Sequence, residues 1–280
     1  MSYNYEMWNV HCENRVATVT INNPPINLGT IALYEEFYEL TKELSADNSL
    51  GVVVIKSDNP EFFLAHVDVS YLLTFPIDKE PEKSAELTEW HAACLRLRRM
   101  NKVTIAQIEG RAGGGGNELA SCCDMRFGVY GKTIFCQMEV PLGIIPGSCG
   151  TQTLPHIIGR NRALEMILSG HDIDAETAER WGYLNRAFEP DAIGPFVDAL
   201  ANRIATFPSL AVQLAKQSVN NAEPMPNEGF LDETYLMARA LQTDDAQRNM
   251  RRFIELDGQS RESELRMGDF CAELASEAKS

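Results

Sequence analysis

The sequence has little positive charge and no long apolar run, and each of these gaps excludes a class of protein. It carries 25 Lys and Arg against 40 Asp and Glu, a formal net charge of −15 over 280 residues. A basic surface for nucleic acid is therefore not expected, and attachment to an anionic membrane is disfavoured. No segment approaches about eighteen uninterrupted apolar residues, and the first residues lack the basic and apolar regions of a secretory signal. We expect a soluble, cytoplasmic protein with no membrane partner.

Several signatures of metal and nucleophile chemistry are also missing. The seven cysteines include no C-x-x-C pair, which indicates reduced core residues rather than a disulfide framework. The five histidines include no pair three or four residues apart, so we predict no metal site. The glycine-rich stretch is not followed by Gly-Lys-Ser/Thr, and Gly147–Gly150 does not match G-x-S-x-G. These absences argue against a phosphate loop and against a serine nucleophile elbow.

Hydrophobic residues make up 44% of the chain, enough for a sizeable core. Alternating and β-branched runs predict strands, and apolar residues at helical spacing predict helices. The expected elements are strands at 8–12, 15–21, 51–55 and 103–108, helices at 30–44 and 84–100, and a loop with a short helix at 59–73. Strands alternating with helices favour an α/β core with at least partly parallel strands.

The chain becomes helical after about Gly150. Helical patterns cover 159–169, 174–181, 191–206 and 210–220, and one long pattern runs from Phe230 to Phe253. The apolar face of that long pattern needs a partner, in the same chain or in another subunit. We divide the chain into a core with the active site, residues 1–207, and a helical oligomerisation region, residues 208–280.

The most informative segment lies between Ile108 and Gly150. An apolar run ends in four glycines, Gly113–Gly116, and a helix-like segment with Glu118 follows at once. Glycines and a helix start expose backbone N–H groups, which suit a developing negative charge on a carbonyl oxygen. Glu139 stands 139 − 118 = 21 residues later and could converge on the same substrate. The plainer alternatives are that the helix dipole favours Glu118 and that Glu139 is a solvated loop carboxylate.

These motifs resemble those of the crotonase, or enoyl-CoA hydratase/isomerase, superfamily. The glycine segment, EGRAGGGGNELASCCD, is similar to the family's N-G-x-A-x-G-G-G-x-E-L-A-x-x-C-D. The segment beginning QMEVPLGIIPGSCGTQTL is similar to Q-P-E-x-x-L-G-x-x-P-G-x-G-G-T-Q-R-L. FFLAHVDV is similar to F-x-A-G-A-D-I, and DAETAERWGYLNRAF is similar to A-x-x-A-x-x-x-G-L-V-x-x-V. The resemblance covers nearly the whole chain.

The resemblance implies an α/β fold, a crotonase-like spiral of β-β-α units, with a C-terminal helical trimerisation region. It implies an acyl-CoA thioester as substrate, a homotrimer or a dimer of trimers, and no cofactor beyond the coenzyme A of the substrate. It also implies a site: the catalytic residues are Glu118 and Glu139, and the oxyanion hole is the backbone N–H groups of Val67 and Gly115. The substrate-binding residues it implies are Ala65, His66, Asp68, Gly114 and Gly147.

Two glutamates at these positions point to hydration of a 2-enoyl-CoA, with Glu118 activating water and Glu139 supplying the α-carbon proton. The alternatives are a Δ3-Δ2 enoyl-CoA isomerase, another crotonase-type hydrolase or decarboxylase, and a non-catalytic acyl-CoA-binding protein. His66 replaces the glycine usual in the oxyanion loop. Its ring either points to solvent or stands at the mouth of the acyl pocket, where it could bind a polar acyl substituent.

Overall fold

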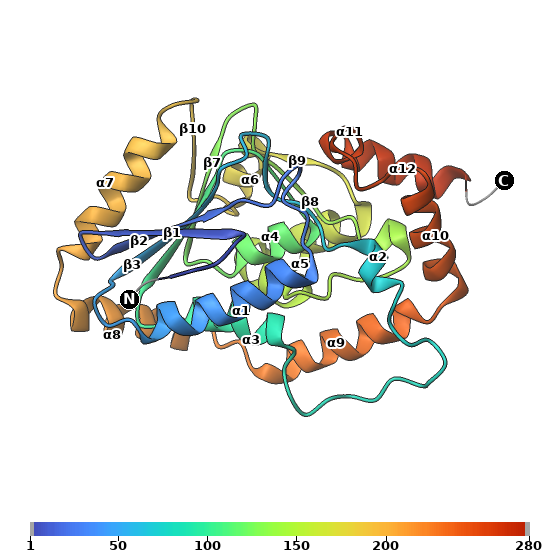
Figure 1. Cartoon of the computed structure of the whole chain (residues 1–280), viewed down its shortest axis with the longest axis horizontal. Helices are drawn as coiled ribbons and strands as arrows, with labels where there is room; N and C mark the ends of the chain where they lie inside the picture. The colour runs from blue at the N-terminus through green and yellow to red at the C-terminus, as the bar shows by residue number, and fades with distance from the viewer. Residues whose placement is uncertain (1–2, 278–280) are drawn as a thin grey trace.

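The computed structural model describes residues 3–277, which build two β-sheets surrounded by helices (Figure 1). The larger sheet pairs β1 with β2 antiparallel, and its other neighbours are parallel. In spatial order its strands are β1 (Trp8–Glu13), β2 (Val16–Ile21), β3 (Val52–Ser57), β5 (Val103–Ile108), β7 (Met125–Val129) and β10 (Arg186–Phe188). The α/β class and the partly parallel sheet predicted from the sequence are confirmed.

The smaller sheet brings the two candidate glutamates to one edge. Its strands, in order, are β4 (Phe62–Leu64), β6 (Arg111–Gly113), β8 (Ile134–Cys136) and β9 (Ile173–Asp174). β6 and β8 are parallel, and Gly113 pairs with Cys136 in register. Helix α4 (Gly114–Ser121), which carries Glu118, begins directly after β6, and Glu139 follows β8 by three residues. Parallel neighbours end at the same edge of a sheet, so both carboxylates leave it on the same side.

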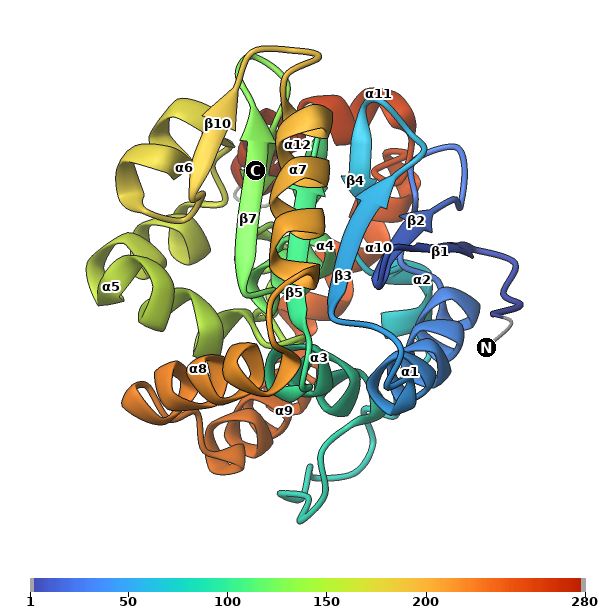
Figure 2. The ribbon, with the colours of Figure 1, turned by 90° about the vertical axis from the view of Figure 1, so that its left-hand side faces the viewer.

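Helices cover both faces of the larger sheet. Val53 and Ile55 of β3 pack into the core under α1 (Ile31–Ala46) and α3 (Glu89–Arg99), whereas Val52 and Val54 face α7 (Ile193–Ala205). Figure 2 shows α7 lying across β5 and β7. Successive strand residues point to opposite faces, and this strand is buried on both, which explains its uninterrupted apolar run.

Several predicted boundaries were wrong, for local reasons. The segment 59–73, expected to be a loop before a short helix, also contains strand β4, and its helix is α2 (Val69–Leu72). α3 begins at Glu89 rather than near residue 84, because the Thr88 side chain caps its first turn. α5 (Gly150–Ser169) begins well before residue 159 and bends at Gly159, whose φ is 78°.

The long helical pattern at 230–253 is two helices, not one. α9 (Asn227–Leu241) ends before Gln242, and Thr243 then caps α10 (Asp244–Glu255) by accepting a hydrogen bond from the Ala246 N–H. A cap stabilises a new helix start, so the periodicity continues in the sequence while the helix axis changes direction. The remaining helices are α6 (Ala175–Trp181), α8 (Ser209–Ala222), α11 (Arg261–Leu265) and α12 (Met267–Glu277), with a short 3-10 turn, η1 (Val140–Leu142).

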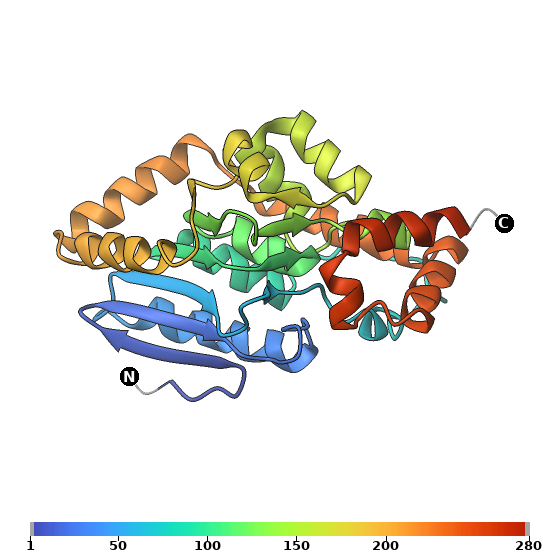
Figure 3. The same ribbon diagram turned by 90° about the horizontal axis from the view of Figure 1, so that it is seen from above.

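Helices α10–α12 gather at the end of the molecule away from α7 (Figures 1 and 3). Met250 and Phe253 of α10 and Phe270 of α12 share one apolar cluster with Met138 and Leu142 beside the second glutamate. The apolar face of α10 therefore has a partner within its own chain. The division of the chain at residue 207 and a trimer-forming role for the helical region stay predictions.

Helix α8 leaves its apolar side chains largely exposed. None of its 14 residues is buried, and Leu210 is 66% and Val219 70% exposed. Across residues 3–277, no helix combines the length and the apolar character needed to cross a bilayer.

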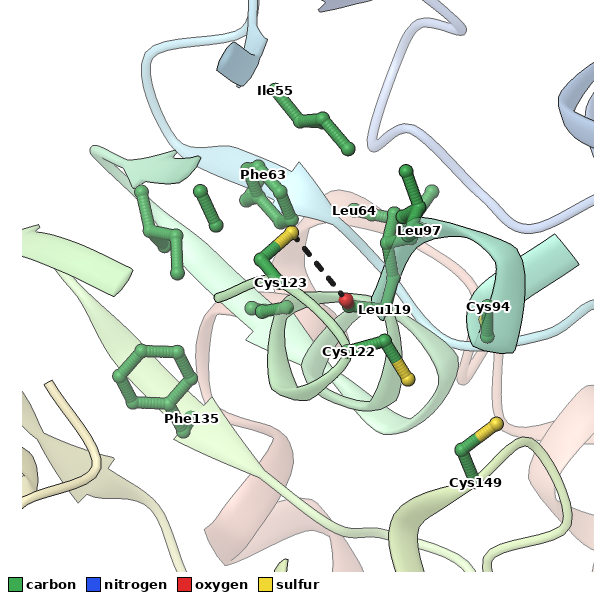
Figure 4. Packing of buried hydrophobic residues seen from close by; sticks show 14 of the residues in the cluster. Ile55, Phe63, Leu64, Cys94, Leu97, Leu119, Cys122, Cys123, Phe135 and Cys149 are labelled. Carbon is green, nitrogen blue, oxygen red and sulfur yellow. Dashed lines mark hydrogen bonds between the residues drawn. The ribbon is translucent and has the colours of Figure 1, made fainter. Parts of the chain in front are cut away.

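The cysteines behave mainly as small apolar side chains. Six of the seven are buried, and Cys12 is exposed. The Cys94, Cys122 and Cys149 sulfurs lie within 4.8 Å of one another in the core, where Figure 4 shows them with Leu97 and Leu119. This cluster backs the start of α5, which contributes to the site described next.

Candidate active site

A cavity of about 420 Å³ opens between α1, α2, α3, α9 and η1, with α4 at its base. Most of its wall is apolar or aromatic, supplied by Tyr34, Tyr71, Phe75, Trp90, Met237 and Leu241 among others. Glu118 and Glu139 both line it, as do His66, Val67 and Gly147. A largely apolar pocket with a few converging polar groups is the usual form of a small-molecule site.

Glu118 is 1% exposed, so it is more than a surface residue favoured by a helix dipole. Its Oε1 accepts hydrogen bonds from the Ser148 N–H at 2.9 Å and the Gly150 N–H at 2.7 Å, at the start of α5. Burial raises the pKa of this carboxyl well above its usual range, and the charges of Glu139 and Glu233 add to that effect. The two amide donors oppose it, because they favour the ionised form.

Glu139 is 8% exposed, so the alternative of a solvated loop carboxylate does not hold. With its amide nitrogen turned toward Glu139, the Gln137 side chain donates to both carboxylate oxygens, at 3.3 and 3.0 Å. Burial raises the pKa of Glu139 to about 8. The cavity thus holds two buried carboxyls whose pKa values are both raised, a pattern associated with acid–base sites.

Val67 lines the cavity, and Gly115, which is not among the lining residues, lies directly beside Val67. Val67 forms an isolated bridge with Gly29, which fixes the loop before α2. Gly115 is in the first turn of α4, where N–H groups have no carbonyl partner within the helix. A Cβ added to Gly115 would lie 3.9 Å from the Val67 nitrogen, and one added to Gly114 would lie 2.7 Å from Glu139 Oε1. Gly114 has a φ of 40°, a conformation that residues with a side chain rarely adopt, whereas a Cβ on Gly115 would be in ordinary contact with the Val67 nitrogen.

The other residues that the resemblance implies for substrate binding divide into two groups. His66 and Gly147 line the cavity, and a Cβ on Gly147 would crowd Met237. Ala65, Asp68 and Gly114 are not among the lining residues: Ala65 is fully buried, and Asp68 caps α2. Substrate contacts by these three stay predictions.

His66 is 2% exposed, so the interpretation in which its ring points to solvent was wrong. Its Nδ1 is hydrogen-bonded to Glu264 Oε2 of α11 at 2.9 Å. The same C-terminal segment holds the loop again, since the Val69 N–H donates to Gln259 Oε1 at 2.7 Å. The loop that carries Val67 is therefore fixed by residues almost two hundred positions away, a contact that no local motif reveals.

A second buried histidine–glutamate pair, His91 and Glu233, also escaped the sequence analysis. His91 Nε2 is 2.9 Å from Glu233 Oε1, which also accepts from the Cys149 N–H at 2.7 Å. Glu233 Oε2 accepts from the Thr151 N–H at 2.9 Å. Glu233 thus holds the backbone at the start of α5, whose amides in turn hold Glu118. The available signal was its position one helical turn after the apolar Phe230.

Residues 11–260 match the enoyl-CoA hydratase/isomerase family. The chain belongs to that family. It is 34% identical over 245 residues to a protein of Mycobacterium leprae described as an enoyl-CoA hydratase, covering 86% of this chain and 92% of the relative. It is 31% identical to a short-chain-enoyl-CoA hydratase of Clostridium acetobutylicum, covering 87% of this chain and 92% of the relative.

The fold agrees with that membership of the enoyl-CoA hydratase/isomerase family. A crystal structure from Streptomyces avermitilis, described as that of an enoyl-CoA hydratase, superposes with a TM-score of 0.82 at 31% identity. The superposition covers 96% of this chain and 100% of the other. The crotonase-like spiral expected from the motifs is therefore confirmed. The match to this family of enzymes extends over nearly the whole chain.

Proposed function

We propose that this member of the enoyl-CoA hydratase/isomerase family adds water across the double bond of a 2-enoyl-CoA thioester. The observation that carries the proposal is the pair of buried carboxyls, Glu118 and Glu139, on one cavity that Val67 also lines, with Gly115 beside Val67. Hydration needs a base for water, an acid for the α-carbon and a site for negative charge. The cavity offers one group or pair for each task.

In the proposed reaction, the thioester oxygen binds between the N–H groups of Val67 and Gly115. Glu118 takes a proton from water as the water oxygen attacks the β-carbon, and the electrons of the double bond move toward the thioester oxygen. The two N–H donors stabilise that enolate-like charge. Glu139 then gives its proton to the α-carbon, which completes a 3-hydroxyacyl-CoA.

The environments of the two glutamates support this division of roles. Burial and the charges of Glu139 and Glu233 raise the pKa of Glu118, and the two backbone donors on its Oε1 act against that rise by stabilising the ionised form, which a base requires. A pKa raised to about 8 keeps Glu139 protonated at neutral pH, which an acid requires. An isomerase, the main alternative, needs one residue of this kind to move a proton between carbons, so it leaves the second buried carboxyl without a task.

The cavity wall suggests the kind of acyl chain. Its aromatic and aliphatic side chains, including Phe75, Met237 and Leu241, suit an apolar acyl group. The proposed chemistry uses water, the thioester and the protein, with no cofactor beyond the coenzyme A of the substrate. We further propose that Ala65, Asp68 and Gly114 contact the substrate when it binds, that the enzyme acts as a homotrimer or dimer of trimers, and that it works in the cytoplasm.

The test is a turnover assay with purified protein and 2-enoyl-CoA thioesters of increasing chain length, alongside the matching 3-enoyl-CoA thioesters. Hydration consumes the conjugated thioester and produces a 3-hydroxyacyl-CoA, which chromatography identifies. We expect turnover of at least one 2-enoyl-CoA. Conversion of 3-enoyl to 2-enoyl thioesters without any hydroxyacyl product would establish the isomerase instead, and binding without turnover would establish a non-catalytic member.

A further inference from the structure

Tyr34 carries a buried hydroxyl that has no hydrogen-bond partner among the described residues. The side chain comes from the first turn of α1 and lines the cavity. A buried hydroxyl without a hydrogen-bond partner destabilises the fold, so a protein keeps one only where another interaction offsets that loss. A bound substrate that supplies the missing acceptor would do so.

The hydroxyl lies beside the two candidate oxyanion donors. A Cβ added to Gly115 would stand 2.9 Å from Tyr34 Oη, 3.2 Å from Val67 Cγ2 and 3.9 Å from the Val67 nitrogen. A Cβ on Gly29 would collide with the same oxygen, so the hydroxyl is wedged between two glycine backbones. The ring is held by Trp90, whose centroid is 4.1 Å away. The positions of the ring and of the hydroxyl oxygen are thus fixed before any ligand enters.

We propose that Tyr34 is a catalytic residue that donates a third hydrogen bond, from its side chain, to the thioester oxygen as negative charge develops there. This inference rests on the proposed function in that it assumes a thioester in the cavity. The Tyr34 hydroxyl would be a third donor beside the two backbone N–H groups. Unlike them, it can be removed by substitution.

The state of the hydroxyl suits a donor. Burial, followed by the nearby charge of Glu118, raises the pKa of Tyr34 well above its usual range. The phenol therefore keeps its proton at any pH at which the enzyme would work. A preorganised donor needs no reorientation during the reaction, and such donors act most strongly where water is excluded.

The first experiment is Tyr34→Phe, which removes the oxygen and keeps the ring against Trp90. Losing one oxyanion donor typically lowers kcat ~10²–10³-fold; with two N–H donors left, we expect a loss of roughly 10- to 100-fold with KM nearly unchanged. The melting temperature without ligand should stay the same or rise, because an unpaired buried hydroxyl is gone. Tyr38→Phe is the matched control: the same helix and substitution, but outside the cavity lining.

The second experiment uses acetoacetyl-CoA, whose enolate form carries negative charge on the thioester and absorbs ultraviolet light differently from its keto form. Wild-type protein and Tyr38→Phe should bind part of it as the enolate, and Tyr34→Phe should bind it with a smaller enolate fraction. This readout needs no hydration. A wild-type protein that hydrates nothing but shows this Tyr34-dependent enolate signal would reject the proposed function and keep the role of Tyr34.

Three results would overturn the inference. They are a Tyr34→Phe variant with the wild-type rate and enolate fraction, one that loses melting temperature together with rate and affinity, and a wild-type protein that binds no acetoacetyl-CoA.

Discussion

Two buried histidine–glutamate pairs, His91–Glu233 and His66–Glu264, tie C-terminal helices to the segments around the cavity. They differ in how many of their polar atoms have hydrogen-bond partners. At His91–Glu233, four donors converge on the carboxylate, and His91 Nδ1 is also hydrogen-bonded to Thr88. At His66–Glu264, the ring nitrogen Nδ1 meets Glu264, whereas Nε2 is buried with no partner among the described residues. We call His91–Glu233 the closed pair, because each of its side-chain nitrogens and oxygens has a hydrogen-bond partner. We call His66–Glu264 the open pair, because His66 Nε2 has none among the described residues.

The difference assigns a task to each pair. The closed pair holds the start of α5, and through Ser148 and Gly150 it fixes the position of Glu118. The open pair holds the loop of Val67 and leaves one polar atom next to the acyl cavity unused. A saturated buried network stabilises one geometry, whereas an unsaturated one is a place where a ligand or a small shift can act.

The largest effect is expected at the carboxyls themselves. Glu118→Gln and Glu139→Gln should each lower kcat by ~10²–10⁴-fold, the usual cost of losing a general acid or base. Thioester affinity should change little, because neither substitution removes the apolar wall or the N–H donors. Steady-state kinetics and calorimetric binding separate the two quantities. A variant that keeps the wild-type rate would remove its glutamate from the mechanism.

Breaking the closed pair should cost more stability than breaking the open one. Glu233→Ala strands a buried imidazole and three other donors, so we expect a loss of about 3–5 kcal/mol in the free energy of unfolding. Glu264→Ala strands one recorded donor, so about 1–3 kcal/mol is expected. Urea unfolding of the two variants side by side measures the difference. Equal losses in the free energy of unfolding would mean that the additional hydrogen bonds of Glu233 do not stabilise the fold.

The proton on Glu139 should appear in the pH profile. Because its pKa is raised to about 8, the acid is protonated below that pH and ionised above it. The value of kcat/KM should therefore fall as pH rises above about 8, approaching tenfold per pH unit if one proton is involved. Glu139→Gln should lose this alkaline limb along with most of its activity. A limb that persists in that variant would assign the titration to another group.

The smallest change in rate is expected from the open pair. His66→Gly restores the residue usual in this loop and should slightly increase turnover of short, simple enoyl-CoA thioesters while reducing any preference for polar acyl groups. The measurement is a ratio of kcat/KM values for a polar and an apolar thioester. An unchanged ratio would limit His66 to supporting its loop.

The sequence predicted the fold class, the order of most elements and both glutamates. Motifs and hydrophobic periodicity are patterns within continuous segments, so they can be read without knowing which distant residues meet. It placed strand β4 in a loop, since three residues carry too little periodicity to reveal a strand. It joined α9 to α10, because the cap at Thr243 interrupts the helix without interrupting the apolar spacing. Glu233 and Glu264 were missed because their partners, His91 and His66, lie far away in the sequence. Tyr34 was the most accessible omission, three residues before Phe37 on the same apolar face.

The most direct test of the central claim is to follow the atoms of water into the product. Wild-type protein is incubated with crotonyl-CoA and with longer 2-enoyl-CoA thioesters in water labelled with heavy oxygen, and in parallel reactions in deuterated water. The products are analysed by mass spectrometry after few turnovers. Hydration by the proposed mechanism places one heavy oxygen on the β-carbon and one deuterium on the α-carbon of a 3-hydroxyacyl-CoA. A product with no labelled oxygen would contradict this mechanism, and so would recovery of every one of the 2-enoyl-CoA thioesters unchanged.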